Sequence, residues 1–205
     1  MRGRAGGKLF PRALPARRVT RKRMPHNIVY FDLETQRSAG DVGGWDKKDR
    51  MGMSIGVTYS TAAGAYRIYG ESDASELIDE LNAADLVIGF NHVGFDYAVL
   101  QAYSMWNIEE QVTSLDLLLD LEVKLGHRIK LDDIATASLG TGKTADGLDA
   151  IRWWREGKIL QIAEYCCFDV KVTKMVHEYG AKHGHVRYKD RFGQERSVEV
   201  NWSLD

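Results

Sequence analysis

The segment NIVYFDLET, residues 27–35, decides the fold of this chain. Its β-branched and aromatic residues predict a buried strand over residues 27–33. Asp32 and Glu34 stand two residues apart at the end of that strand, so their carboxylates leave the same face at the rim of a sheet. Alone, the pair is more typical of a solvated strand end than of a site. If the two carboxylates are buried, they repel each other, and a divalent cation that takes oxygen ligands removes that cost.

The order of the remaining elements predicts an α/β fold. Short links join the first strand to strands over residues 53–59 and 65–69, which predicts an antiparallel meander. Strands over residues 85–90 and 112–115 follow, separated by helices. We expect a five-stranded mixed sheet, three antiparallel strands then two parallel, flanked by helices and followed by a C-terminal β-hairpin. The other expected elements are a long loop over 37–50, a helix capped by Ser72 or Asp73, helices over 95–106, 131–138, 147–156 and 159–182, one ending at Leu125, and hairpin strands over 185–188 and 197–202.

Two further acids, Asp96 and Asp169, lie where a strand or a helix could bring them to the same rim of the sheet. Asp96 closes the segment GFNHVGFD, where a strand ends and a helix begins, although the helix dipole alone explains an acid there. Tyr165 and Asp169 are four residues apart on the long helix and therefore share a face, which Ile162 and Val172 mark as partly buried. A buried acid needs a partner, and an ordinary cationic side chain is the simplest one.

Together the four acids indicate more than each does alone. In enzymes that hydrolyse phosphodiesters, four carboxylates can hold two metal ions about 3.5–4 Å apart. One ion activates the attacking water and the other stabilises the leaving oxygen, while a tyrosine hydroxyl beside them can orient the water. The sequence therefore predicts a site for two divalent cations, Mg²⁺ or Mn²⁺.

Three motifs carry a resemblance to a known family. FDLET, GFNxxxFD and YCxxD resemble, in this order, the motifs of the DEDD superfamily of 3′–5′ exonucleases, which have an RNase H-like fold. The tyrosine four residues before the last aspartate is similar to the DEDDy subclass. The chain looks closest to the YprB-type, helicase-associated branch. That closer resemblance rests on GGW, MGMS, SLDLLLDL, LDDIATASLG and a closing hairpin that ends at Trp202, and it covers about residues 27–202.

The resemblance implies a role for each site residue. Asp32 would bridge both metals, with Glu34 and Asp169 on the metal that holds the nucleophile. Asp96 would hold the second metal through water, and Tyr165 would position the attacking water. The implied activity is 3′–5′ cleavage of single-stranded DNA or RNA ends.

Asn91, Phe95 and Lys143 are the expected substrate contacts. Phe95 can wedge against a terminal base or pack in the core. Lys143 lies in GTGKT, which is not a phosphate-binding loop because Ala137 stands where that pattern requires glycine. His92 can contact phosphate near the metals or be an ordinary loop histidine. Trp153 and Trp154 lie at helical spacing and are expected in the core.

The charge is unevenly distributed. Nine of the 28 Lys and Arg residues lie in residues 1–25, which contain none of the 29 Asp and Glu, so the remainder carries a net charge of −10. This basic head could be an arm that binds nucleic acid, a transit-type peptide, or the product of a start site upstream of Met24. We expect one RNase H-like domain over residues 26–205, in the cytoplasm, because the only cysteines, Cys166 and Cys167, are adjacent. No apolar run approaches the length of a transmembrane helix.

Three functions remain open on the sequence. The leading hypothesis is a two-metal 3′–5′ exonuclease whose weak attraction for nucleic acid is supplemented by the basic head or by a separate helicase. The second is a nucleic-acid-binding or scaffolding module with the same fold and little activity. The third is an endonuclease or structure-specific nuclease, because the same carboxylates do not determine the polarity of cleavage.

Overall fold

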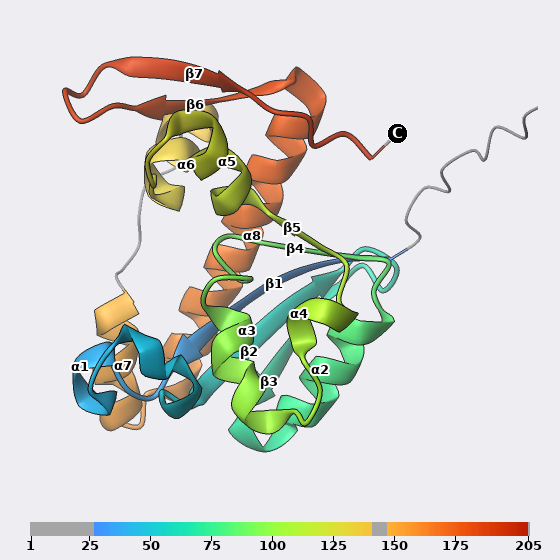
Figure 1. Cartoon of the computed structure of the whole chain (residues 1–205), viewed down its shortest axis with the longest axis vertical. Coiled ribbons are helices and arrows are strands. Elements are labelled where there is room, and N and C mark those ends of the chain that lie inside the picture. Colours follow the sequence, from blue (N-terminus) through green and yellow to red (C-terminus); the bar gives the residue numbers. More distant parts are fainter. Residues whose placement is uncertain (1–26, 141–146, 205) are drawn as a thin grey trace, which may run out of the picture.

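A mixed five-stranded sheet forms the centre of the molecule (Figure 1). The computed structural model describes residues 27–140 and 147–204. The strand order is β3-β2-β1-β4-β5, with β1 antiparallel to β2, β2 antiparallel to β3, and β4 parallel to both β1 and β5. The strands are β1 (Ile28–Thr35), β2 (Met53–Ser60), β3 (Ala65–Gly70), β4 (Leu86–Gly89) and β5 (Ser114–Asp116). The expected fold class is confirmed.

β1 lies in the middle of the sheet and contributes to a core on each face. Val29, Phe31 and Leu33 pack in one cluster of buried residues. Tyr30 packs in the other, so the next two side chains on that face are those of Asp32 and Glu34. The alternation along a single strand therefore separates a face that is apolar at residues 29, 31 and 33 from one that ends in two carboxylates.

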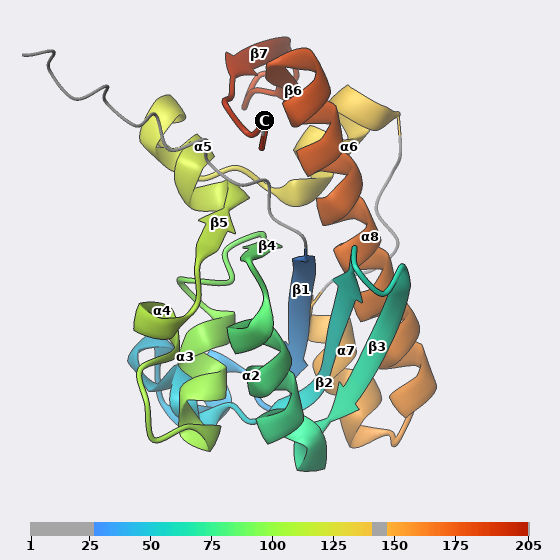
Figure 2. The same ribbon diagram turned by 90° about the vertical axis from the view of Figure 1, so that its right-hand side faces the viewer.

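Helices cover both faces (Figure 2). One face is covered by α2 (Ala74–Ala83), α3 (Asp96–Leu100) and α4 (Ile108–Gln111), which supply Leu77, Leu100 and Ile108 to the core. The other is covered chiefly by α8 (Ile159–His183), which contacts β1 and β2 directly. The remaining helices on that side are α5 (Leu117–Leu125), α6 (Leu131–Leu139) and α7 (Gly147–Arg155).

The C-terminal hairpin stacks on α6 and on the end of α8. Its strands are β6 (His185–Lys189) and β7 (Glu195–Glu199). Trp202 is buried against α8, where a Cβ atom on Gly180 would overlap the indole ring, and its Nε1 donates to Asp120 of α5 at 2.8 Å. The second hairpin strand was expected over residues 197–202, but the final residues leave the ladder to make this contact.

The structure corrects two further expected elements and adds two short helical ones. Residues 37–50 are not one long loop: they contain α1 (Ala39–Val42), capped reciprocally by Ser38 and Asp41, and the 3-10 helix η1 (Trp45–Arg50). The helix expected over 95–106 is shorter, because α3 ends in the 3-10 turn η3 (Gln101–Tyr103). α4 and the 3-10 turn η2 (Glu71–Asp73) were not expected.

Within the described residues, the structure contains no helix that is both long and apolar enough to cross a membrane.

Candidate metal centre

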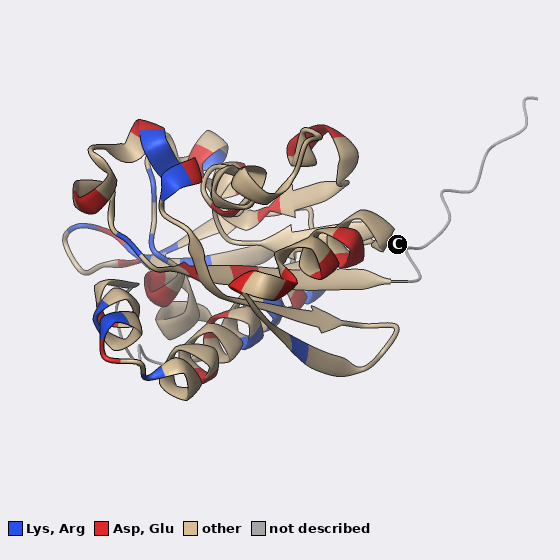
Figure 3. Ribbon diagram, turned by 90° about the horizontal axis from the view of Figure 1, so that it is seen from below, with Lys and Arg blue, Asp and Glu red and all other residues tan. Residues whose placement is uncertain are grey.

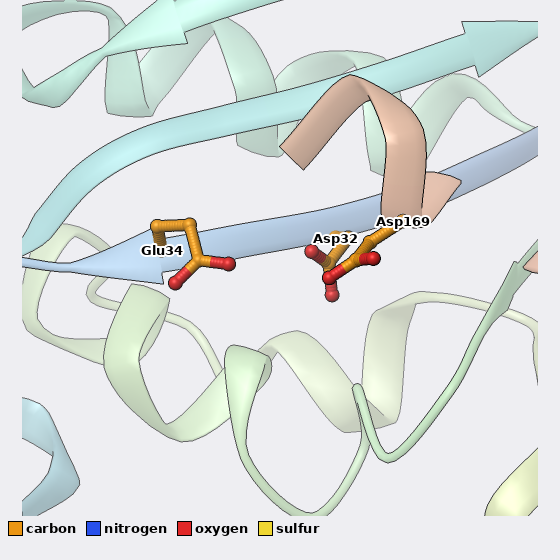
Figure 4. A group of neighbouring side chains, drawn as sticks. All are labelled: Asp32, Glu34 and Asp169. Atoms are coloured by element: carbon orange, nitrogen blue, oxygen red, sulfur yellow. The ribbon is translucent and has the colours of Figure 1, made fainter. Parts of the chain in front are cut away.

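Three carboxylates converge between β1 and α8. Asp32 and Glu34 come from one face of β1, and Asp169 descends from α8 above them (Figure 4). One ligand oxygen from each lies within 4.8 Å of the other two. Glu34 is buried, whereas Asp32 and Asp169 remain partly exposed, so the group is accessible from solvent. These three acids are therefore placed to share one cation.

The surroundings of Asp32 make its charge costly. Burial raises its pKa well above the usual range, and the charges of Asp96, Asp169 and Glu34 raise it further. Among the described residues, no Lys or Arg forms an ion pair with Asp32. The three carboxylates repel one another, and no Lys or Arg in the described part of the chain pairs with Asp32 to offset its charge. They offer only hard oxygen donors, which fit a divalent cation such as Mg²⁺ or Mn²⁺.

Tyr165 lies one helical turn before Asp169 and forms a side-chain hydrogen bond with it. Burial raises the pKa of the tyrosine, and the nearby charges of Asp169 and Glu34 raise it further, so the phenol stays protonated. Trp153 of α7 packs edge-on against the ring, with centroids 5.9 Å apart. Trp153 is a buried core residue, as expected, and it holds the phenol beside the carboxylates.

Asp96, the fourth acid, is the first residue of α3 and lies beside the backbone of β1. Its Oδ1 accepts a hydrogen bond from the backbone N–H of Leu33 at 3.0 Å, between the two acids of the strand. Asp96 is buried, and this burial raises its pKa to about 7 against the opposing effect of the Leu33 bond. It is not part of the three-carboxylate group, although its charge acts on Asp32.

The loop that leads to Asp96 is held by Asp116, a residue that the sequence did not single out. The Asp116 carboxylate accepts from the backbone N–H groups of Asn91 at 2.8 Å and Val93 at 3.0 Å, and also caps α5. Asn91 adopts a left-handed conformation with φ of 70°, which asparagine tolerates better than most residues. The signal was present in the sequence, because Asp116 ends a short strand directly before a helix.

His92 does not reach the site surface. It is fully buried, with its Nδ1 3.5 Å from the Asp116 carboxylate, and burial lowers its pKa to about 4. The suggestion that His92 contacts substrate phosphate is therefore wrong, because its imidazole is neutral and enclosed by protein and cannot reach a phosphate in solvent. His92 packs edge-on against Tyr97 instead, with centroids 5.1 Å apart.

The expected substrate contacts were Asn91, Phe95 and Lys143, and the structure describes the first two. The Asn91 side-chain oxygen accepts from Arg128 at 2.6 Å, so the amide is directed toward the link between α5 and α6. Phe95 lines a cavity beside Glu34. Lys143 lies outside the described residues.

The cavity beside Glu34 has a volume of about 580 Å³. Two of its lining residues, Trp45 and Phe95, make a T-shaped aromatic contact with centroids 6.3 Å apart. Trp45 is 68% exposed, although it is one of the largest apolar side chains. The other lining residues are Glu34, Thr35, Arg37, Ser38, Ala39, Gly40, Met51, Leu148 and Ile151. A mainly apolar hollow with an exposed indole thus adjoins the carboxylates.

Cys166 is a second residue that sequence reasoning missed. Its buried thiol lies 3.4 Å from the Asp32 backbone oxygen and 3.5 Å from the carboxylate Oδ2. Burial and the nearby Asp32 charge raise the pKa of the thiol well above its usual range. The protonated sulfur therefore donates weakly to Asp32 and helps to hold its rotamer.

Comparisons with known proteins agree with this architecture. A family model described as the RNase_H superfamily matches residues 29–180, a segment that contains all four acids and Tyr165. A solved structure of the family B DNA polymerase from the hyperthermophilic archaeon Pyrobaculum calidifontis is similar, with a TM-score of 0.56 and 15% identity. The likeness covers 75% of this chain and 24% of the polymerase chain, so this chain spans about a quarter of that protein and shares its fold there. No curated protein matches the sequence significantly.

Proposed function

Because this chain belongs to the RNase H superfamily, we propose that it is a metal-dependent 3′–5′ exonuclease acting on single-stranded ends of DNA or RNA. The observation that carries the proposal is the convergence of Asp32, Glu34 and Asp169, with one oxygen of each within 4.8 Å of the others. The motif pattern adds the DEDDy subclass and the YprB-type branch to the proposal. On this account residues 26–205 form the nuclease domain.

Asp32, Glu34 and Asp169 would hold the first cation, and Asp32 would share the second with Asp96. When bound, such cations lower the pKa of a bound water and stabilise the charge on a leaving oxygen. Asp96 is held in place by its hydrogen bond from Leu33, so its carboxylate is positioned relative to Asp32 by the strand itself. An interposed water would suit its place outside the three-carboxylate group.

Tyr165 would orient the attacking water. Its phenol is protonated and hydrogen-bonded to Asp169, so it can donate to or accept from a water next to that acid. Because burial raises the pKa of the phenol, the phenolate that could act as a general base does not form. The residue therefore acts by positioning the water.

The aromatic cavity would receive the terminal base. Trp45 and Phe95 line a hollow that also contains Glu34, so a base stacked there would place its phosphodiester near the carboxylates. Only an unpaired end offers a free base face for such stacking, which favours single strands. Asn91 and Lys143 remain proposed substrate contacts on the motif pattern alone.

The surroundings in the cell are also proposed. A helicase supplied separately would provide single-stranded ends, and the cytoplasm suits the free thiols of Cys166 and Cys167. The basic head, residues 1–25, lies outside the described residues, and an arm that binds nucleic acid remains one interpretation of it.

The test is cleavage by the full chain of 5′-labelled single-stranded DNA and RNA in Mg²⁺ or Mn²⁺. We expect a ladder that shortens from the 3′ end and is abolished by EDTA and by Asp32→Ala. Glu164→Gln, on an exposed position of α8, should cleave normally and controls for the substitution of an acid. Cleavage of a circular single strand would support an endonuclease instead, and a folded protein that binds but cuts neither polymer would support the binding module.

A further inference from the structure

A second hollow lies at the other end of the molecule, between the link from α5 to α6 and the tip of the hairpin. Its volume is about 690 Å³. We call this hollow the hairpin groove. It is lined by His127, Arg128, Ile129, Lys130, Asp133, Lys189, Asp190, Arg191 and Phe192. None of them belongs to the carboxylate site or to the aromatic cavity beside Glu34.

The hairpin groove has more basic than acidic lining residues, whereas residues 26–205 as a whole carry a net charge of −10. Figure 3 marks the Lys, Arg, Asp and Glu positions along the ribbon. Four of its nine lining residues are Lys or Arg and two are Asp. In the part of the chain that the structure describes, no carboxylate lies within ion-pair distance of Lys130, Lys189 or Arg191. The groove therefore presents free cationic side chains that attract a polyanion.

One of the two acids in the groove already has internal partners. The Asp190 carboxylate accepts from the backbone N–H groups of Phe192 and Gln194, both at 2.9 Å, and from the guanidinium of Arg196 at 3.1 Å. These bonds lower its pKa and close the turn at the hairpin tip. Asp190 thus shapes the loop, and its charge is compensated within the turn.

An aromatic side chain accompanies the cations. Phe192 is 73% exposed at the tip of the hairpin, and the Arg191 guanidinium lies 4.8 Å from the centre of its ring. An exposed aromatic ring paired with a guanidinium plane is the combination on which unpaired bases stack. Lysines for phosphates and a ring for bases distinguish this groove from a simple anion patch.

A direct contact joins the groove to the loop of the fourth acid. Arg128 lines the groove and also donates to the Asn91 side chain at 2.6 Å, at the start of the loop that ends at Asp96. In Figure 1 the hairpin lies at the top of the molecule and the end of β1 in its lower half. A strand that occupies both the groove and the carboxylate site would therefore run along the long axis of the molecule.

We infer that the hairpin groove binds single-stranded nucleic acid, holding the stretch of strand that lies upstream of the end at Asp32, Glu34 and Asp169. The inference rests on the proposed function for what happens at that end. Lys130 and Lys189 would contact phosphates, and Phe192 with Arg191 would stack on a base. The groove thereby supplies the attraction that a domain with net charge −10 otherwise lacks.

The test measures binding without cleavage. Fluorescence anisotropy in EDTA would compare labelled oligothymidylates of about 4 and about 16 nucleotides, the range that one single-strand-binding fold contacts. The full chain should bind the longer strand more tightly. The double variant Lys130→Ser/Lys189→Ser should lose that advantage and flatten the dependence of log K on log salt by about 0.7 per lost phosphate contact. Arg67→Ser/Lys182→Ser removes the same charge from exposed positions outside the groove and should keep both properties.

Each outcome decides the inference. Equal losses in the groove variant and in the control variant would show a general charge effect and overturn it, as would an unchanged salt slope in the groove variant. Phe192→Ala should weaken binding of the longer strand without changing the dependence of log K on log salt, because stacking releases no counterions. Binding that depends on the groove in a chain that cleaves nothing in Mn²⁺ would reject the proposed function while the groove stands. Normal cleavage by a chain whose binding is unaffected by the groove variants would reject the groove while the proposed function stands.

Discussion

The carboxylate of Asp96 accepts a hydrogen bond from the backbone N–H of Leu33 at 3.0 Å, so two motifs that are 63 residues apart are joined by one bond. Leu33 stands between Asp32 and Glu34 on β1. The position of Asp96 relative to Asp32 and Glu34 is therefore determined by the end of β1.

Replacing Asp96 separates catalysis from stability. Asp96→Asn keeps an acceptor for Leu33 and removes a buried charge, so the free energy of unfolding without metal should stay equal or rise, while cleavage is lost. Asp96→Leu leaves the Leu33 N–H without its partner and should cost about 1–3 kcal/mol. Urea unfolding measures both variants. An Asp96→Asn protein that cleaves normally would remove Asp96 from the site.

Asp96 should contribute less stability to the metal-free protein as pH rises. Its pKa is raised from 3.8 to about 7, so between these values this carboxyl binds more protons in the folded chain than in the unfolded chain. Its contribution to the free energy of unfolding therefore falls with increasing pH across that window, and the raised pKa of Asp32 acts in the same direction. The lowered pKa of His92 acts in the opposite direction, so the comparison of wild type with Asp96→Asn is needed to isolate the carboxyl. In urea unfolding with EDTA, the free energy of unfolding of wild type minus that of Asp96→Asn should fall across the window, and Mn²⁺ should oppose the fall; a difference that rises across the window would contradict the prediction.

Tyr165→Phe should reduce the cleavage rate and leave the fold intact. The phenylalanine ring keeps the edge-on contact with Trp153 but loses the hydroxyl beside Asp169. We expect a rate loss of about 10²-fold or more, typical of removing a group that positions a proton or water. Single-turnover cleavage measures the rate. Tyr66→Phe, at an exposed position on β3, is the matched control and should be neutral.

Trp45→Ala should weaken substrate binding more than it slows the chemistry. An aromatic ring that stacks on a base contributes about 1–3 kcal/mol, so KM should rise about tenfold with kcat nearly unchanged. Trp106 offers a matched control, because it is 67% exposed against 68% for Trp45 and does not line the cavity. Equal effects of Trp45→Ala and Trp106→Ala on KM would refute the stacking role.

The shared faces of two pairs of site residues could be predicted from periodicity. Asp32 and Glu34 share a strand face because side chains alternate, and Tyr165 and Asp169 share a helix face because they are four residues apart. The structure confirms both arrangements. The sequence pattern also predicted the strand directions, because short links favour antiparallel neighbours and helical crossovers favour parallel ones. It did not predict that β4 lies beside β1 rather than beside β3.

Long-range side-chain contacts could not be predicted in the same way. The bond from Leu33 to Asp96, the thiol of Cys166 beside Asp32, and the carboxylate of Asp116 under the loop all depend on tertiary packing. The elements within residues 37–50 were missed for a different reason. Glycines in that segment suggested a loop, whereas Ser38 and Asp41 form a local reciprocal cap that stabilises one short helical turn.

Binding of Mn²⁺ to the full chain at neutral pH, measured by isothermal titration calorimetry, tests the central claim most directly. The account predicts saturable binding to the wild-type protein and to the exposed-acid control Glu164→Gln, and its loss in Asp32→Asn and Asp169→Asn with folding retained. A folded wild-type protein that takes up no Mn²⁺, or one whose binding survives both substitutions, would contradict the account.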